Sequence, residues 1–123
     1  MTFEEYWAAG ATGLAEDLVP PDYVAACRVR GFNGLLDVRA MRLCVGALMS
    51  LIFSQIVGDG TRSRQPKLGD AYDLWHAVQA SVADVFVTYD KRFAGLLRRV
   101  PIDGFNVFST IPELLQSIRS TQP

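Results

Sequence analysis

The stretch "KLGDAYDLWHAVQASVADVFVTYDKRF", residues 67–93, decides the fold class of this chain. Its first part predicts a helix over 70–82, and "DVFVTYD" is a short run of β-branched and aromatic residues that is typical of a strand. A helix ("KRFAGLLRRV"), a second strand ("FNVFS") and a last helix ("TIPELLQSIRS") follow with short links. This alternation predicts an α/β fold with a parallel sheet flanked by crossover helices.

The N-terminal half offers only helices. Thr2, with Glu5 three residues later, forms a capping box for "FEEYWAAGATGLAEDL", and a short helix, "YVAACRVR", stops at Gly31. Asn33 is the expected cap of a longer helix. Apolar residues recur on one face of that helix at three- and four-residue steps: Met41, Val45, Leu48, Met49, Ile52 and Ile56. We therefore expect a helix-rich half beside an incomplete or rearranged sheet.

The composition predicts one globular domain over residues 1–123, since half of the residues are hydrophobic and a fifth are charged. A net charge of −1 gives no overall attraction to nucleic acid or to an anionic membrane, so any polyanion site must be a local patch. Cys27 and Cys44 have no paired spacing and read as core thiols of a reducing compartment.

We expect a soluble, cytoplasmic protein without a membrane partner. The N-terminal "MTFEEYW" is acidic where a secretory signal is basic. The most apolar stretch, 43–57, is shorter than the roughly 18 residues that suggest a membrane span.

Three aspartates are placed to meet at one edge of the predicted sheet. Asp70 and Asp73 open the 70–82 helix, and Asp90 follows the strand that comes next. Because helix and strand run antiparallel, the helix start and the strand end lie at the same edge, where parallel α/β sheets bind ligands. Capping of the helix start is an equally good reading of Asp70 and Asp73 on spacing alone.

Crowded carboxylates repel one another unless a cation or a shared proton neutralises them. Hard oxygen ligands select Mg²⁺ or Mn²⁺ over Zn²⁺, and such an ion completes its shell with waters and a substrate phosphate. The chemistry implied is hydrolysis of a phosphodiester. His76, one turn further along, reads as a packing residue more readily than as a base.

Basic residues flank these aspartates and could contact RNA phosphates. The loop "GDGTRSRQPKLG" (58–69) reads either as a surface connection or as a basic rim. Solvated surface charge is as good an account of this set, which comprises Arg62, Arg64, Lys67, Lys91 and Arg92.

The segment "GDAYDLWHAVQASVADVFVTYDKRF" resembles the C-terminal signature of PIN-domain ribonucleases, the family of the toxin halves of many bacterial toxin–antitoxin pairs. The resemblance extends over residues 68–116, and "D-x-x-D-x-x-H" at Asp70 matches a fuller form in some relatives. The resemblance implies a Mg²⁺- or Mn²⁺-dependent endoribonuclease with a PIN-like sheet, with RNA as substrate and an antitoxin-like protein as partner. The matching residues are Asp73, Ala77, Ala80, Thr88, Asp90, Lys91 and Phe93.

The chain departs from the family at its start, where PIN domains have a strand that ends in an aspartate. Glu16 or Asp17 stands at about the distance expected for the family's helical acid, so Glu16 is a candidate fourth ligand beside Asp70, Asp73 and Asp90. A missing strand leaves backbone groups unpaired, which a second chain, a rearranged topology or further sequence would remedy. The alternative function is a catalytically degenerate module that acts through homodimerisation or partner binding.

Overall fold

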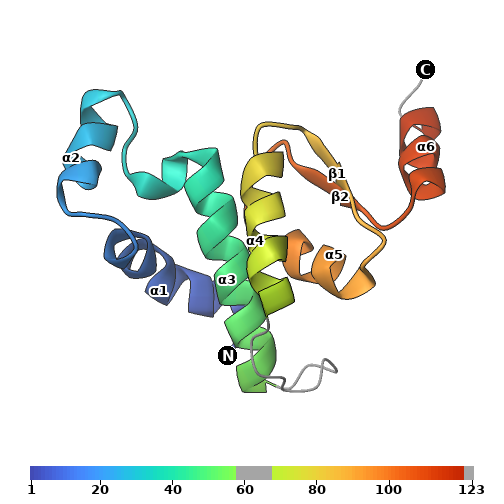
Figure 1. The fold of residues 1–123 in the computed structure, drawn as a ribbon, viewed down its shortest axis with the longest axis horizontal. Helices are drawn as coiled ribbons and strands as arrows, with labels where there is room; N and C mark the ends of the chain where they lie inside the picture. The colour runs from blue at the N-terminus through green and yellow to red at the C-terminus, as the bar shows by residue number, and fades with distance from the viewer. Residues whose placement is uncertain (58–67, 121–123) are drawn as a thin grey trace.

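A computed structural model describes residues 1–57 and 68–120, and the side chains of these residues other than 68–70. Six α-helices, one short 3₁₀ helix (η1) and two strands follow one another in this part of the chain (Figure 1). In chain order they are α1 Phe3–Asp17, α2 Asp22–Val29, η1 Leu35–Asp37, α3 Arg39–Val57, α4 Leu68–Ala80, β1 Val85–Val87, α5 Lys91–Arg98, β2 Asn106–Phe108 and α6 Ile111–Ser120.

The expected α/β class with a parallel sheet is confirmed in its coarse form. β1 and β2 pair in parallel, with Phe86 opposite Val107, and α5 connects them. In the described part of the chain the sheet contains these two strands and no others. The N-terminal half is helical, as expected. A two-stranded sheet is too small to define a PIN-like topology.

Helix α3 lies between the two halves of the molecule, with α1 and α2 on one side and α4, α5 and the sheet on the other (Figure 1). One hydrophobic cluster joins α3 to α1 and includes Phe3, Ala11, Ala15, Val45, Met49 and Phe53. A second cluster joins α3 to α4 and α5 and includes Leu43, Ala47, Ala77, Phe93 and Leu97. The expectation of one apolar face was therefore too narrow, because α3 buries two.

By length and composition α3 is also the one described helix that could cross a membrane, a test that core helices of soluble proteins pass as well. The helix is longer than the apolar stretch 43–57 from which its length was judged, because it begins at Arg39.

The helix caps agree with the sequence at α1 and disagree at α3. Thr2 and Glu5 form the predicted capping box, in which the Glu5 amide donates to Thr2 Oγ1 at 3.1 Å. Asn33 does not cap α3, because η1 intervenes between them. The Asn33 amide instead donates to the Asp37 carboxylate at 3.0 Å. A 3₁₀ turn has no periodicity long enough to be read from sequence.

Arg39, at the start of α3, fixes the entry to both strands. Its guanidinium donates to the carbonyl oxygens of Ser81 at 2.9 Å, Ala83 at 3.1 Å and Asp103 at 2.8 Å. Ser81 and Ala83 precede β1, and Asp103 precedes β2. One cationic side chain therefore satisfies three carbonyls and sets the sheet against α3, which leaves the carboxyl ends of the strands for the candidate site.

Candidate active site

Asp73 and Asp90 line the same small depression in the surface, although they belong to different elements of the fold. Asp73 comes from α4, and Asp90 stands between β1 and α5. Arg92 lines the depression as well, and its apolar wall consists of Ala47, Leu51, Leu74, Phe93 and Leu96. The volume is about 10 Å³, which is the room that about one water-sized sphere needs. The depression therefore has room for one ion or one water molecule.

Asp90 is held in place by the turn that begins α5. One of its oxygens, Oδ1, accepts a hydrogen bond from the Phe93 amide at 3.1 Å, which makes Asp90 the N-cap of α5. The Asp90 amide donates to Thr88 Oγ1 at 3.2 Å. The pattern "T-x-D" thus forms a local turn that orients the carboxylate. The sequence reading placed the capping role on Asp70 and missed it at Asp90.

Asp73 is half-buried, and capping does not account for it. The helix begins at Leu68, two residues before the predicted start at residue 70, so Asp73 is its sixth residue. Free amide groups are confined to the first four residues of a helix. The carboxylate therefore lies beyond the first turn of α4, where free amides and the helix dipole stabilise an acid. It lines the depression instead.

The remaining predicted residues fall into three groups. Arg62, Arg64, Lys67 and the side chain of Asp70 lie outside the described residues, although the Asp70 backbone is in α4, one turn before Asp73. Lys91 is exposed in the first turn of α5. Glu16 lines a separate depression with Arg28 and Asp37, between α1, α2 and η1, and the structure does not bring it to Asp73 and Asp90.

Two further reactive side chains, His76 and Cys44, lie on α4 and α3. His76 is exposed on α4, so the expectation that it packs into the interior was wrong. Cys44 is a half-buried free thiol. Burial raises the pKa of Cys44 above its ordinary value, which keeps the thiol protonated and makes it a poor nucleophile at neutral pH.

Asp73 and Asp90 are the acids at the depression, so they are the residues there that could hold a cation. Among the described side chains no group of three or more His, Cys, Asp and Glu could hold a metal ion, so the site offers a pair of carboxylates. Mg²⁺ is commonly bound by one or two carboxylates, with waters and substrate phosphates completing its octahedral shell. Arg92 adds a fixed positive charge, which suits a phosphate in the same place.

Comparison of this chain with protein-family models, with curated proteins and with the solved structures gave no match in any of the three. The likeness to PIN-domain ribonucleases therefore rests on the stretch 68–116 of the sequence.

Proposed function

We propose that this chain is a Mg²⁺- or Mn²⁺-dependent endoribonuclease of PIN-like type that hydrolyses RNA phosphodiesters. The observation that carries the proposal is that Asp73, from α4, and Asp90, from the start of α5, line one depression of ion size together with Arg92. Two acids that line one depression together with an arginine suit the binding of a metal ion and a phosphate together.

Each residue has a distinct role in this proposal. Asp73 and Asp90 hold the cation, and the capping bond to Phe93 keeps Asp90 oriented before substrate arrives. Arg92 binds a non-bridging oxygen of the scissile phosphate, while Lys91 and the basic loop residues steer the RNA backbone. When bound, the cation would lower the pKa of a coordinated water and offset negative charge in the transition state.

The biological setting follows from the sequence resemblance. PIN-domain toxins act on RNA in the cytoplasm and are held in check by an antitoxin. We accordingly propose a cytoplasmic toxin component with an antitoxin-like protein as partner. This part of the proposal is supported by the "D-x-x-x-A-x-x-A" and "T-x-D" patterns at Asp73 and Thr88.

One observation favours a second candidate function, a binding module that recruits an extended peptide. The Thr88 amide donates to the Phe108 carbonyl at 3.0 Å and the Asn106 amide donates to the Asp84 carbonyl at 2.8 Å, so both bonds continue the β1–β2 ladder. In a parallel ladder, alternate residues point to opposite edges, so the backbone groups of Val85 and Val87 face away from β2. In the described part of the chain no strand covers that edge, and an added strand from a partner would complete the sheet.

The experiment that tests the proposed function is RNA cleavage under metal control. We expect purified protein to cleave a labelled structured RNA in Mg²⁺ or Mn²⁺, to stop when EDTA removes the metal and to resume when metal is restored. Ca²⁺ is the control ion, since its larger size and looser geometry suit the depression poorly. Cleavage that persists in EDTA would rule out the metal mechanism, and absence of cleavage with both metals would favour the binding module.

A further inference from the structure

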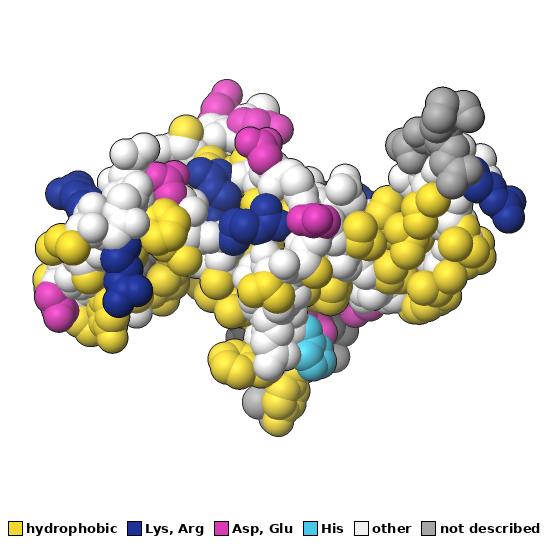
Figure 2. All heavy atoms as spheres, turned by 90° about the horizontal axis from the view of Figure 1, so that it is seen from above, with side chains coloured by type: hydrophobic (Ala, Val, Ile, Leu, Met, Phe, Trp, Pro, Cys, Tyr) yellow, Lys and Arg dark blue, Asp and Glu magenta, His cyan; other side chains and the backbone are white. Residues whose placement is uncertain are grey.

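A second cleft lies at the start of α3, and none of its lining residues belongs to the candidate active site. We name it the α3 cleft. Its volume is about 280 Å³, compared with roughly 300 Å³ for the smallest ligand pockets. Figure 2 shows Arg and Lys side chains among Asp and Glu side chains in the middle of the face that it presents. The cleft is lined by two basic, two acidic and two aliphatic residues, which are Arg39, Arg42, Asp37, Asp103, Leu36 and Ile102.

Backbone carbonyl oxygens hold the two guanidinium groups of the cleft in place. Arg39 and Arg42 stand three positions apart on α3 and therefore share one helix face. Nη1 of Arg39 donates to the Asp103 carbonyl at 2.8 Å, and Nη1 of Arg42 donates to the Pro101 carbonyl. The Arg42 guanidinium also lies over the ring of Trp7, 5.7 Å from its centroid. Both positive charges are thus fixed against the loop between α5 and β2 before any ligand arrives.

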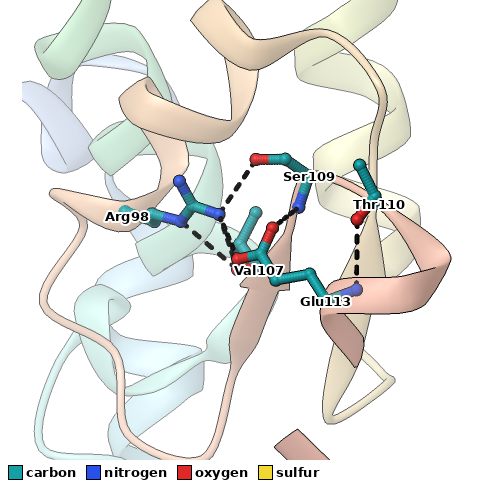
Figure 3. Close-up of polar contacts among 5 residues, drawn as sticks. All are labelled: Arg98, Val107, Ser109, Thr110 and Glu113. Atoms are coloured by element: carbon teal, nitrogen blue, oxygen red, sulfur yellow. Dashed lines mark hydrogen bonds and ion pairs between the residues drawn. The ribbon is translucent and has the colours of Figure 1, made fainter. Parts of the chain in front are cut away.

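Among the described residues, no carboxylate lies within ion-pair distance of either guanidinium group. Arg98 provides the contrast, because its guanidinium forms an ion pair with the Glu113 carboxylate at 3.2 Å (Figure 3). The carbonyl partners of Arg39 and Arg42 are neutral and use only part of the N–H groups that a guanidinium carries. The cleft therefore offers positive charge and hydrogen-bond donors to the carboxylate of a ligand.

The acids of the cleft follow its aliphatic residues in the chain. Asp37 comes after Leu36 and Asp103 after Ile102, and both acids are exposed. Oδ2 of Asp37 accepts a hydrogen bond from the Asn33 amide at 3.0 Å, which orients this carboxylate. A ligand with negative charge alone is repelled by the two acids, whereas a ligand that also carries a positive group is attracted to them. The charges of the cleft therefore favour a zwitterion, and its aliphatic residues favour a ligand with an apolar part.

We propose that the α3 cleft binds a free α-amino acid with an aliphatic side chain, such as leucine. The two arginines bind its carboxylate, the two aspartates bind its ammonium group, and Leu36 and Ile102 contact its side chain. Such a ligand connects η1 and the start of α3 with the loop before β2, so its binding stabilises the folded protein. The inference does not depend on the metal site or on nuclease activity.

Isothermal titration calorimetry with leucine tests the inference. We expect a Kd on the order of 1 mM, because the ligand is small and the acids of the cleft are exposed. Two analogues each lack one charge: 4-methylpentanoate has no ammonium group, and 3-methylbutylamine has no carboxylate. Each should bind at least tenfold more weakly than leucine. Glycine, which has no aliphatic side chain, should also bind more weakly, and saturating leucine should raise the Tm.

A pair of charge substitutions locates the binding site. Asp37→Asn combined with Asp103→Asn should weaken leucine binding at least tenfold without weakening the binding of 4-methylpentanoate, which has no group for the aspartates. Asparagine at position 37 keeps an oxygen for the Asn33 amide. Glu4→Gln combined with Asp22→Asn is the matched control, because both are exposed acids outside the cleft, and it should bind leucine like the parent.

Three results would overturn the proposal. The first is a parent protein that gives neither heat of binding nor a rise in Tm with leucine. The second is binding of 4-methylpentanoate or inorganic phosphate as tightly as leucine, which would make the cleft a site for anions alone. The third is equal leucine affinity in the parent and in the variant with Asp37→Asn and Asp103→Asn, which would place the binding site elsewhere.

Discussion

Replacing Gly46 with alanine is expected to lower the stability of the protein by about 2 kcal/mol and its Tm on the order of 5–10 °C. A Cβ atom at Gly46 would overlap with Cγ1 and Cγ2 of Val100 and would lie 3.0 Å from its Cβ, and Val100 is itself buried. Overpacking of this kind costs about 3 kcal/mol at the upper end of its usual range, and the better helix propensity of alanine returns about 1 kcal/mol. Thermal and urea denaturation followed by circular dichroism measure the change.

The control for Gly46→Ala is Gly13→Ala in α1, where a Cβ would meet no atom within 4 Å. That variant should be more stable than the parent by about 0.5–1 kcal/mol, from helix propensity alone. Adding Val100→Ala to Gly46→Ala should restore part of the loss, since it removes the two methyl groups that clash. A Gly46→Ala protein as stable as the parent would contradict the close packing of α3 on the end of α5.

Asp73→Asn and Asp90→Asn are each expected to lower metal-dependent RNA cleavage by at least about 100-fold, since loss of an outer-shell partner of a metal already costs 10- to 100-fold. Asparagine keeps the size of the side chain and removes the negative charge that a divalent cation requires. At Asp90 it also keeps an oxygen for the Phe93 amide, so α5 remains capped and a loss of activity reports the charge. Initial rates on a labelled RNA, measured at saturating Mn²⁺, give the comparison.

Glu16→Gln is the matched control for these two variants. Glu16 is an exposed acid that lines a different depression, so the substitution makes the same change of charge away from the candidate site. We expect parental activity from it. Cleavage by Asp73→Asn at the parental rate would remove the nuclease proposal, and a loss in Glu16→Gln equal to that of Asp73→Asn would return Glu16 to the ligand set.

Local signals in the sequence predicted the parts of the fold that depend on local chemistry. Thr2 and Glu5 stand at the spacing of a capping box, and the box forms. The runs around Phe86 and Val107 contain β-branched and aromatic residues. They form two strands that pair in parallel and are connected by α5. These features need only a few neighbouring residues, so the sequence is sufficient to identify them.

Features that depend on contacts between segments far apart in the chain could not be predicted from the sequence. Both faces of α3 are covered, because α1 packs on the side of Val45 and Met49 while α4 and α5 pack on the side of Leu43 and Ala47. A continuous apolar run shows that a helix is buried without showing what covers each face. The guanidinium contacts of Arg39 with three carbonyls likewise join segments more than 40 residues apart.

The candidate site divides in the same way. The topological rule that ligands bind at the carboxyl ends of parallel strands anticipated that Asp73 and Asp90 would lie at one place, and the two line a common depression. The capping function of Asp90 and the position of Arg92 beside it depend on where α5 begins, which sequence patterns locate only to within a few residues. Spacing along the chain suggested Glu16, whereas the fold places it in another depression.

The most direct test of the account is Mn²⁺ binding in the absence of RNA, followed by electron paramagnetic resonance of the free ion. We predict that the parent and Glu16→Gln each bind one Mn²⁺ per chain, that Mg²⁺ competes for the same site, and that Asp73→Asn and Asp90→Asn bind at least about tenfold more weakly. Equal Mn²⁺ affinity in all four proteins would contradict the claim that Asp73 and Asp90 together form a divalent-cation site.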